Sequence, residues 1–173
     1  MITISKVLTI DAAVFDTLFD ASYGKMEQGT MPWEALGTLT TLEEKKQALL
    51  DVFVDFCKWP STKVLLWHKD GIPIHMGAGS IDLEDPSYIT WKWALVGPDA
   101  NNSKSWLYDA AYLEQKREYF KSTLGVIGYK IECVKDGTLY NYHMNKPNAA
   151  DFHEISEEIS EDGKLSIITA TYK

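Results

Sequence analysis

The sequence has little cysteine and no long apolar run, and each shortage excludes a class of protein. Its 173 residues include only two cysteines, Cys57 and Cys133, whose spacing suggests neither a disulfide framework nor a zinc site. No apolar run approaches the roughly 20 residues that a membrane-spanning helix needs. We therefore expect a reduced, intracellular protein without a membrane anchor and without a metal site.

Basic residues are also scarce relative to acidic ones. The chain carries 17 lysines and arginines against 25 aspartates and glutamates, which gives a formal net charge of −8. Because binding to nucleic acid depends on basic side chains that neutralise phosphates, this balance disfavours a nucleic-acid partner. Lys116, Arg117 and Lys121 are interpreted as the solvated face of a helix rather than as a basic patch. We expect neither nucleic acid nor a membrane among the partners.

Apolar and aromatic residues are plentiful, and they indicate a folded core. The chain is 45% hydrophobic and 12% aromatic, which is inconsistent with disorder. Its length falls within the usual range of roughly 100–200 residues per domain, so we expect one domain over residues 1–173. The first residues, Met1–Lys6, lack a secretory signal pattern and are typical of a strand.

Apolar periodicity predicts the order of strands and helices. Apolar residues at alternate positions predict strands at 2–10, 62–67, 72–80, 88–96, 126–134, 151–159 and 165–172. Apolar residues at helical spacing predict helices at 12–23, 42–58, 110–124 and 138–146. Thr41 and Glu44 fit a capping box, while Asp109 and Gly125 suit the two ends of the third helix. This order indicates a layered α+β or α/β domain.

Further motifs support the layout without indicating a reaction. Asp70-Gly71 predicts a hairpin turn, so that residues 62–96 form an antiparallel meander. Trp91 and Trp93 lie on one face of their strand and are interpreted as core residues rather than as a stacking platform. The sequence has no Gly-x-Ser-x-Gly elbow, no P-loop and no Rossmann fingerprint. The residues alone establish a fold class but no chemistry.

The stretch 88–125 is the part of the chain that points to function. A predicted strand ends at Gly97, a polar loop follows, and the next helix begins after Asp109. Because the first amides of a helix are unpaired, a polar loop between a strand and a helix N-terminus is a common anion site. Lys104 and the serines on either side of it would contact a phosphate. A polar surface loop is the alternative.

This order of elements resembles that of the GNAT N-acetyltransferase fold, most clearly over Val64–Tyr172. Two stretches, Lys69–Ile74 and Phe152–Thr169, look like parts of the small GNAT-like internal virion proteins of short-tailed phages. The resemblance implies an α/β (α+β) domain with a mixed, mostly antiparallel central sheet flanked by helices. It also implies a bacteriophage protein located in the host cytoplasm or the virion interior.

The resemblance implies acetyl-CoA as the cofactor. In that family the fourth strand and the next helix flank the pyrophosphate loop, which corresponds here to Gly97–Tyr108. Its cofactor-binding residues would be Leu95, Val96, Gly97, Asn102, Ser103, Lys104 and Ser105. This loop is longer than the family's and has glycine only at its first position, whereas the family's glycines let backbone amides approach phosphate.

Acetyl transfer to an amine needs a base for the amine and an acid for the departing thiolate. The family often places a tyrosine acid on the short helix after the fifth strand, where this chain offers Tyr140, Tyr142 and His143. His75 and Glu132 are the candidates for the base. Core or rim packing is the alternative for the tyrosines, and a structural role is the alternative for His75.

Two functions stay open at this point. One is an acetyl-CoA-dependent N-acetyltransferase that acts on an unknown amine acceptor. The other is a non-catalytic virion component or protein-binding module of the same fold, because a fold does not determine a function. Met31 and Trp33, in the loop Gly24–Gly37, are where an acceptor or a virion protein would dock.

Overall fold

The computed structural model describes residues 1–25, 36–97, 109–144 and 152–173, and its strands form one mixed sheet. The order of the seven strands is β1-β2-β3-β4-β5-β7-β6. Their bounds are Ile2–Lys6, Thr62–Lys69, Ile72–Ile81, Tyr88–Val96, Gly128–Val134, Phe152–Ile159 and Leu165–Tyr172 for β1 to β7. β4 and β5 are parallel, whereas β1–β2, β5–β7 and β6–β7 are antiparallel. This mixed α/β architecture confirms the predicted fold class.

The helices are α1 (Ala12–Lys25), α2 (Leu42–Phe56), α3 (Ala110–Tyr119) and α4 (Thr138–Met144), and α3 continues into a π-helical turn, Phe120–Leu124. Among the described residues, no helix is both long enough and apolar enough to span a membrane. Contacts divide the chain into two compact units. The first is Met1–Gly79 with Trp93–Gly97, and the second is Ser80–Lys92 with Pro98–Lys173. The single domain expected from the length stays a prediction.

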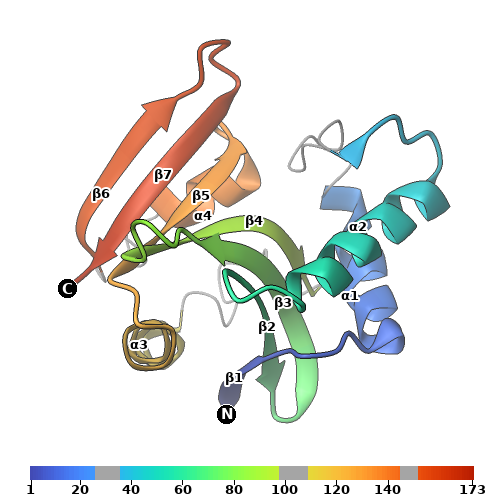
Figure 1. The fold of residues 1–173 in the computed structure, drawn as a ribbon, viewed down its shortest axis with the longest axis horizontal. Coiled ribbons are helices and arrows are strands. Elements are labelled where there is room, and N and C mark those ends of the chain that lie inside the picture. The colour runs from blue at the N-terminus through green and yellow to red at the C-terminus, as the bar shows by residue number, and fades with distance from the viewer. Residues whose placement is uncertain (26–35, 98–108, 145–151) are drawn as a thin grey trace. The chain divides into compact units, whose positions relative to one another are not determined.

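In the first unit α1 and α2 pack against each other beside the strands (Figure 1). The rings of Phe15 and Phe53 meet edge to face at 5.7 Å, and Lys46 of α2 forms an ion pair with Asp16 of α1 at 3.2 Å. The buried core of this unit consists of Phe15, Leu18, Phe19, Leu49, Phe53, Val64, Met76, Ala78, Trp93 and Leu95. Burial of these apolar side chains stabilises the unit.

The N-terminus of α2 confirms the predicted capping box. The Thr41 hydroxyl accepts a hydrogen bond from the Glu44 amide at 3.2 Å, and the Glu44 carboxylate accepts from the amides of Thr40 and Thr41 at 2.8 and 2.9 Å. These backbone bonds to Thr40 and Thr41 favour the charged carboxylate and lower the pKa of Glu44 from 4.5 to about 2.

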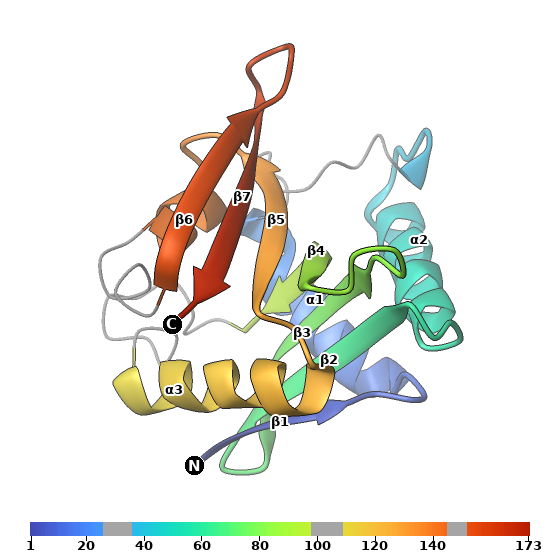
Figure 2. The same ribbon diagram turned by 60° about the vertical axis from the view of Figure 1, so that its left-hand side comes forward.

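In the second unit β5, β7 and β6 run side by side (Figure 2). Aromatic rings fill one face of these strands: Tyr129 contacts Phe152 and Tyr172 at 5.4 and 6.0 Å, and Phe120 from the end of α3 contacts Tyr172 at 6.0 Å. Trp91 packs against the same Phe120 ring at 5.7 Å. The predicted burial of Trp91 and Trp93 is confirmed, since they are 8% and 9% exposed.

Several element ends agree with the sequence, and others differ. Asp109 caps α3, and Gly125 ends the helical segment with a φ of 71°. However, the last turn is π-helical, with the Val126 amide bonded to the Phe120 carbonyl at 3.1 Å. The first strand ends at Lys6 rather than at residue 10. Asp11 accepts from the Ala13 amide at 2.9 Å and begins α1.

We expect Gly128→Ala to destabilise the second unit strongly. A Cβ at Gly128 would overlap the Ala170 carbonyl oxygen and lie 2.9 Å from the Thr171 Cα, both backbone atoms of β7 that have no room to retreat. The expected loss is about 3 kcal/mol or more in urea unfolding. The comparison is Gly163→Ala, where nothing lies within 4 Å and a φ of +71° alone costs about 1–2 kcal/mol. Equal losses in the two variants would contradict the tight β5–β7 approach.

The capping box makes stability depend on acid. The pKa of Glu44 in the folded protein lies below its usual value. The contribution of Glu44 to the free energy of unfolding is therefore complete above pH 4.5 and is lost as the pH falls toward about 2. We expect the urea midpoint of the native protein to fall more steeply over this range than that of Glu44→Gln. Glu43→Gln, in the same helical turn but outside the box, should retain the native slope. Parallel slopes for all three proteins would contradict the assignment.

Candidate functional site

The end of β4 is held by hydrogen bonds from within the first unit. The Ser22 hydroxyl, buried on α1, accepts from the Val96 amide at 2.7 Å and donates to the Val96 carbonyl at 2.8 Å. The Gly97 amide donates to the Ile74 carbonyl of β3, also at 2.8 Å. Two of the main-chain donors predicted to bind the cofactor are therefore already bonded. The predicted cofactor-binding roles of Val96 and Gly97 stay predictions, without these amides as donors.

The bonds at Gly97 and Val96 show which way the preceding β4 backbone faces. Gly97 bonds to β3, so by strand alternation the N–H and C=O of Val96 and of Ala94 point away from β3. The parallel register of β4 with β5 runs from Tyr88 to Trp91. Ala94 thus follows the last β4 residue in register with β5, which is Trp91, and precedes Val96, which bonds to Ser22. The side chain of Leu95, the next predicted residue, is fully buried in the core.

The anion site predicted at the start of α3 has a competing group. The Asp109 carboxylate accepts from the Tyr112 amide at 3.0 Å, which removes one of the unpaired donors and places a negative charge at the helix N-terminus. Asn102, Ser103, Lys104 and Ser105 lie outside the described residues, as do Met31 and Trp33. Their predicted roles stay predictions.

The candidates for the base lie on two different strands. His75 belongs to β3 in the first unit, where its half-buried ring meets the Trp67 ring at 4.4 Å. Glu132 lies on β5 in the second unit, with its carboxylate exposed. Their roles stay predictions. An exposed carboxylate fits proton abstraction from a solvent-borne amine, whereas a ring packed against tryptophan fits a structural role.

The sheet register separates Glu132 from Tyr140, the candidate acid on α4. The Tyr140 hydroxyl donates to Glu157 Oε2 at 3.2 Å, and Glu157 is paired with Ile168, which in turn is paired with Ile131. Side chains opposite one another share a face of the sheet, so Tyr140 lies on the face of Ile131. Glu132 follows Ile131 and points to the other face. The structure therefore does not bring these two candidates together. For Tyr142, the other tyrosine, the side chain lies outside the described part of the structure.

Glu157 contributes, after burial, to the raised pKa values of its neighbours Tyr140 and Cys133. Burial, followed by the hydrogen bond to Glu157, raises the pKa of Tyr140, so its phenol stays protonated at neutral pH. Burial and, after it, the charge of Glu157 raise the pKa of Cys133 to about 11, so its thiol stays protonated at neutral pH. Ser166 donates to the other Glu157 oxygen at 2.7 Å and fixes the carboxylate.

The sequence analysis missed a buried polar cluster in the second unit. The Tyr129 hydroxyl lies 2.7 Å from His143 Nδ1, and both side chains are buried. Lys116 is only 7% exposed, with its ammonium 5.0 Å from the Tyr129 ring centroid and 6.0 Å from that of Phe120. The interpretation of Lys116 as a solvated residue is therefore wrong. Its spacing of three from Leu113 and four from Phe120 is the signal that places it on the buried helix face.

Replacement of Glu157 should lower the pKa of Tyr140. Glu157→Gln removes the negative charge that disfavours the phenolate, so the pKa should move down toward its ordinary value. NMR titration of ring-labelled tyrosine, with Tyr140→Phe to assign the signal, measures the change. The matched control is Glu154→Gln on the same strand, which should leave the Tyr140 pKa unchanged. An unchanged pKa in Glu157→Gln would refute the contact.

Comparisons with solved structures bear on the fold as a whole. The chain is similar to the Campylobacter jejuni N-acetyltransferase PseH in complex with acetyl coenzyme A, with 12% identity over 100% of both chains and a TM-score of 0.58. It is also similar to RimL, a ribosomal L7/L12 alpha-N-protein acetyltransferase in complex with coenzyme A, with 10% identity over 98% of this chain and 94% of that one and a TM-score of 0.63.

A third similar structure is a putative acetyltransferase of the GNAT family from Desulfovibrio desulfuricans, with 13% identity over 99% of both chains and a TM-score of 0.58. No protein-family model and no curated protein matches the sequence. At this level of identity the likeness concerns the architecture of the chain. The protein therefore has the fold of the GNAT acetyltransferases.

Proposed function

We propose that the protein is an acetyl-CoA-dependent N-acetyltransferase. Support comes from the sheet order, with its parallel β4–β5 pair in an otherwise antiparallel setting, and from a similar structure that holds acetyl coenzyme A. Bound acetyl-CoA would supply a thioester, whose acyl carbon an amine attacks. The resemblance of two sequence stretches to internal virion proteins of phages is carried by the sequence alone and stays a prediction.

The cofactor proposal rests on the direction of the β4 main chain at Ala94, which points away from β3. A strand whose N–H and C=O face away from its neighbour can bind an extended, amide-bearing ligand as an added strand would bind. The pantetheine arm of coenzyme A has such amides. Val96 cannot extend this edge, because Ser22 already bonds both of its main-chain groups. The proposed contact with the arm is therefore confined to the β4 backbone around Ala94.

The proton-transfer roles follow from the faces of the sheet. Glu132 is exposed on β5 and is proposed as the base that keeps the acceptor amine neutral. Tyr140 is on the opposite face, where its hydroxyl donates a hydrogen bond to Glu157, so Glu132 and Tyr140 would not serve as the base and the acid of one transfer. The acid for the thiolate is proposed to come from α4. The acceptor is an amine of unknown identity.

The non-catalytic alternative keeps one specific argument. The loop 97–108 has glycine only at its first position, so close approach of backbone amides to a diphosphate is less favourable than in a glycine-rich loop. In that case the fold serves as a virion component or protein-binding module. Binding of acetyl-CoA decides between the two functions.

Calorimetric titration tests the proposal directly. We expect acetyl-CoA to bind with a dissociation constant on the order of micromolar, about −8 kcal/mol. Because the predicted contact is with the pantetheine arm, S-acetyl-pantetheine should compete for the site, whereas ADP should compete more weakly. The absence of both heat and a thermal shift with acetyl-CoA would refute the transferase and leave the non-catalytic function.

A Glu132→Gln variant then separates binding from chemistry. If Glu132 is the base, the variant should bind acetyl-CoA as the native protein does and lose transfer to amines, with partial recovery at higher pH where the amine is neutral without help. Glu154→Gln, an exposed carboxylate on β6, is the matched control. Native transfer rates in Glu132→Gln would show that another group acts as the base.

A further inference from the structure

We propose that the outer edge of β6 is a docking strand, to which an extended basic segment of a partner protein adds by main-chain hydrogen bonding. This inference is independent of acetyl transfer. β6 is the terminal strand of the sheet, and in the described part of the chain its one strand neighbour is β7. An edge strand presents a row of N–H and C=O groups that another strand can pair with.

The register identifies which groups face outward. The Ser160 amide donates to the Leu165 carbonyl at 3.0 Å, so this pair is hydrogen-bonded across the β6–β7 hairpin. In an antiparallel ladder bonded and non-bonded pairs alternate. Counted back from Ser160, the main-chain groups of Ile159, Glu157 and Ile155 therefore point away from β7. The pairing is regular over this stretch, because the one irregularity lies between Phe152 and Glu154.

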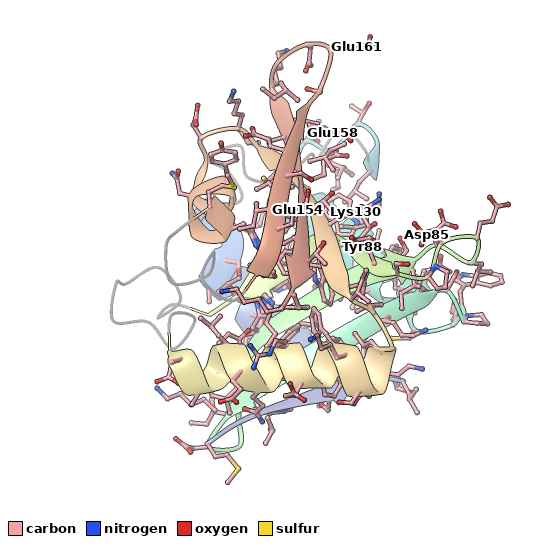
Figure 3. All side chains as sticks on the ribbon, turned by 90° about the vertical axis from the view of Figure 1, so that its left-hand side faces the viewer. Asp85, Tyr88, Lys130, Glu154, Glu158 and Glu161 are labelled. Atoms are coloured by element: carbon pink, nitrogen blue, oxygen red, sulfur yellow. The ribbon has the colours of Figure 1, made fainter. Side chains whose placement is uncertain are left out.

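The side chains along this edge carry one sign of charge. From His153 to Gly163 the sequence has five acidic residues and no lysine or arginine. Glu154, Glu158 and Glu161 are exposed and follow one another along the hairpin (Figure 3). Within the described residues neither Glu154 nor Glu158 takes part in an ion pair, whereas Glu157 is bonded to Tyr140 and Ser166. The free charges thus lie on the face of Glu154 and Glu158.

One basic residue on that face, Lys130, is directed elsewhere. Lys130 lies on the row of Thr169 and Ser156 in the register, but its ammonium sits 5.3 Å from the ring centroid of Tyr88 on β4. It also contributes to the lowered pKa of Asp85, after the hydrogen bonds from Ser87. Figure 3 shows Asp85, Tyr88 and Lys130 together, apart from the upper part of the hairpin. Lys130 therefore leaves the charge of Glu158 uncompensated.

Charge decides the kind of occupant. A second copy of this chain, paired edge to edge through β6, would bring glutamates against glutamates, and like charges in facing positions destabilise a sheet. A lysine- or arginine-bearing segment would place opposite charges there. Ile159, 52% exposed on the other face, adds an apolar contact. The occupant is thus an extended segment with basic residues on one face and small apolar residues on the other.

The test uses a capped peptide, Lys-Val-Lys-Thr-Lys-Val-Lys, with native-state hydrogen exchange as the readout. Bound as a strand, the peptide should slow exchange at the amides of Ile155, Glu157 and Ile159. The amides of Ser156 and Glu158 already face β7 and should change little. At ten times the dissociation constant the expected slowing is roughly tenfold. A peptide held only by charge would not protect alternate amides, and that outcome would overturn the proposal.

Two controls sharpen the outcome. The same peptide with N-methyl groups on its pairing edge keeps its charge but cannot donate, so it should bind far more weakly; equal binding would overturn main-chain docking. Glu154→Lys with Glu158→Lys should reject the lysine peptide and accept its glutamate counterpart, whereas Asp51→Lys with Asp55→Lys on α2 makes the same change of net charge and should not. If amide exchange at these positions slowed with rising protein concentration in the absence of peptide, the occupant would be a second copy of this chain, and the proposal would be overturned.

Discussion

The structure depends on how the main chain of β4 is hydrogen-bonded along its length. Residues Tyr88–Lys92 belong to one compact unit and Trp93–Gly97 to the other, so this strand is common to both. Buried backbone groups need hydrogen-bond partners. The main chain of β4 lies beside β3, pairs with β5 as far as Trp91, and bonds to the Ser22 hydroxyl at Val96. Ala94 lies between the end of the β5 register at Trp91 and Val96, which bonds to Ser22. We propose that a ligand binds to the main chain at this position. The proposed cofactor contact rests on this direction of the Ala94 main chain, away from β3.

Local signals in the sequence were sufficient for most of the fold. Alternation of apolar residues gave the bounds of β4 and β7, and the capping box at Thr41 and the N-cap at Asp109 are both present. Such signals depend on residues within one turn or one strand, so a single sequence carries them. The π-helical turn after Tyr119 does not follow from helical periodicity. Phe120, the first residue of this turn, packs against Trp91 and Tyr172, which are distant in sequence.

The candidate site was less predictable, for a physical reason. Glu132 and Tyr140 were each chosen by residue type, but whether they can act together depends on register between strands far apart in sequence. A shift of one residue exchanges the two faces of a strand. The pairing of β5 with β7 and of β7 with β6 places Tyr140 and Glu132 on opposite faces, and no local pattern contains that information. Lys116 is the reverse case: its helical spacing indicated burial, but its charge suggested solvent.

The acidic side chains of β6 bear both on unwanted strand pairing at this edge and on the choice of a partner. A sheet that ends in an uncovered strand risks pairing with any extended chain, and charged side chains on the edge are a common protection. Protection by a single sign of charge is selective, however. An edge with only negative charges repels acidic partners and attracts basic ones. The net charge of −8 strengthens this bias at long range, and the local row of glutamates sets the register at contact. The same glutamates that would oppose edge-to-edge pairing of two copies are therefore the groups by which a basic strand would be selected.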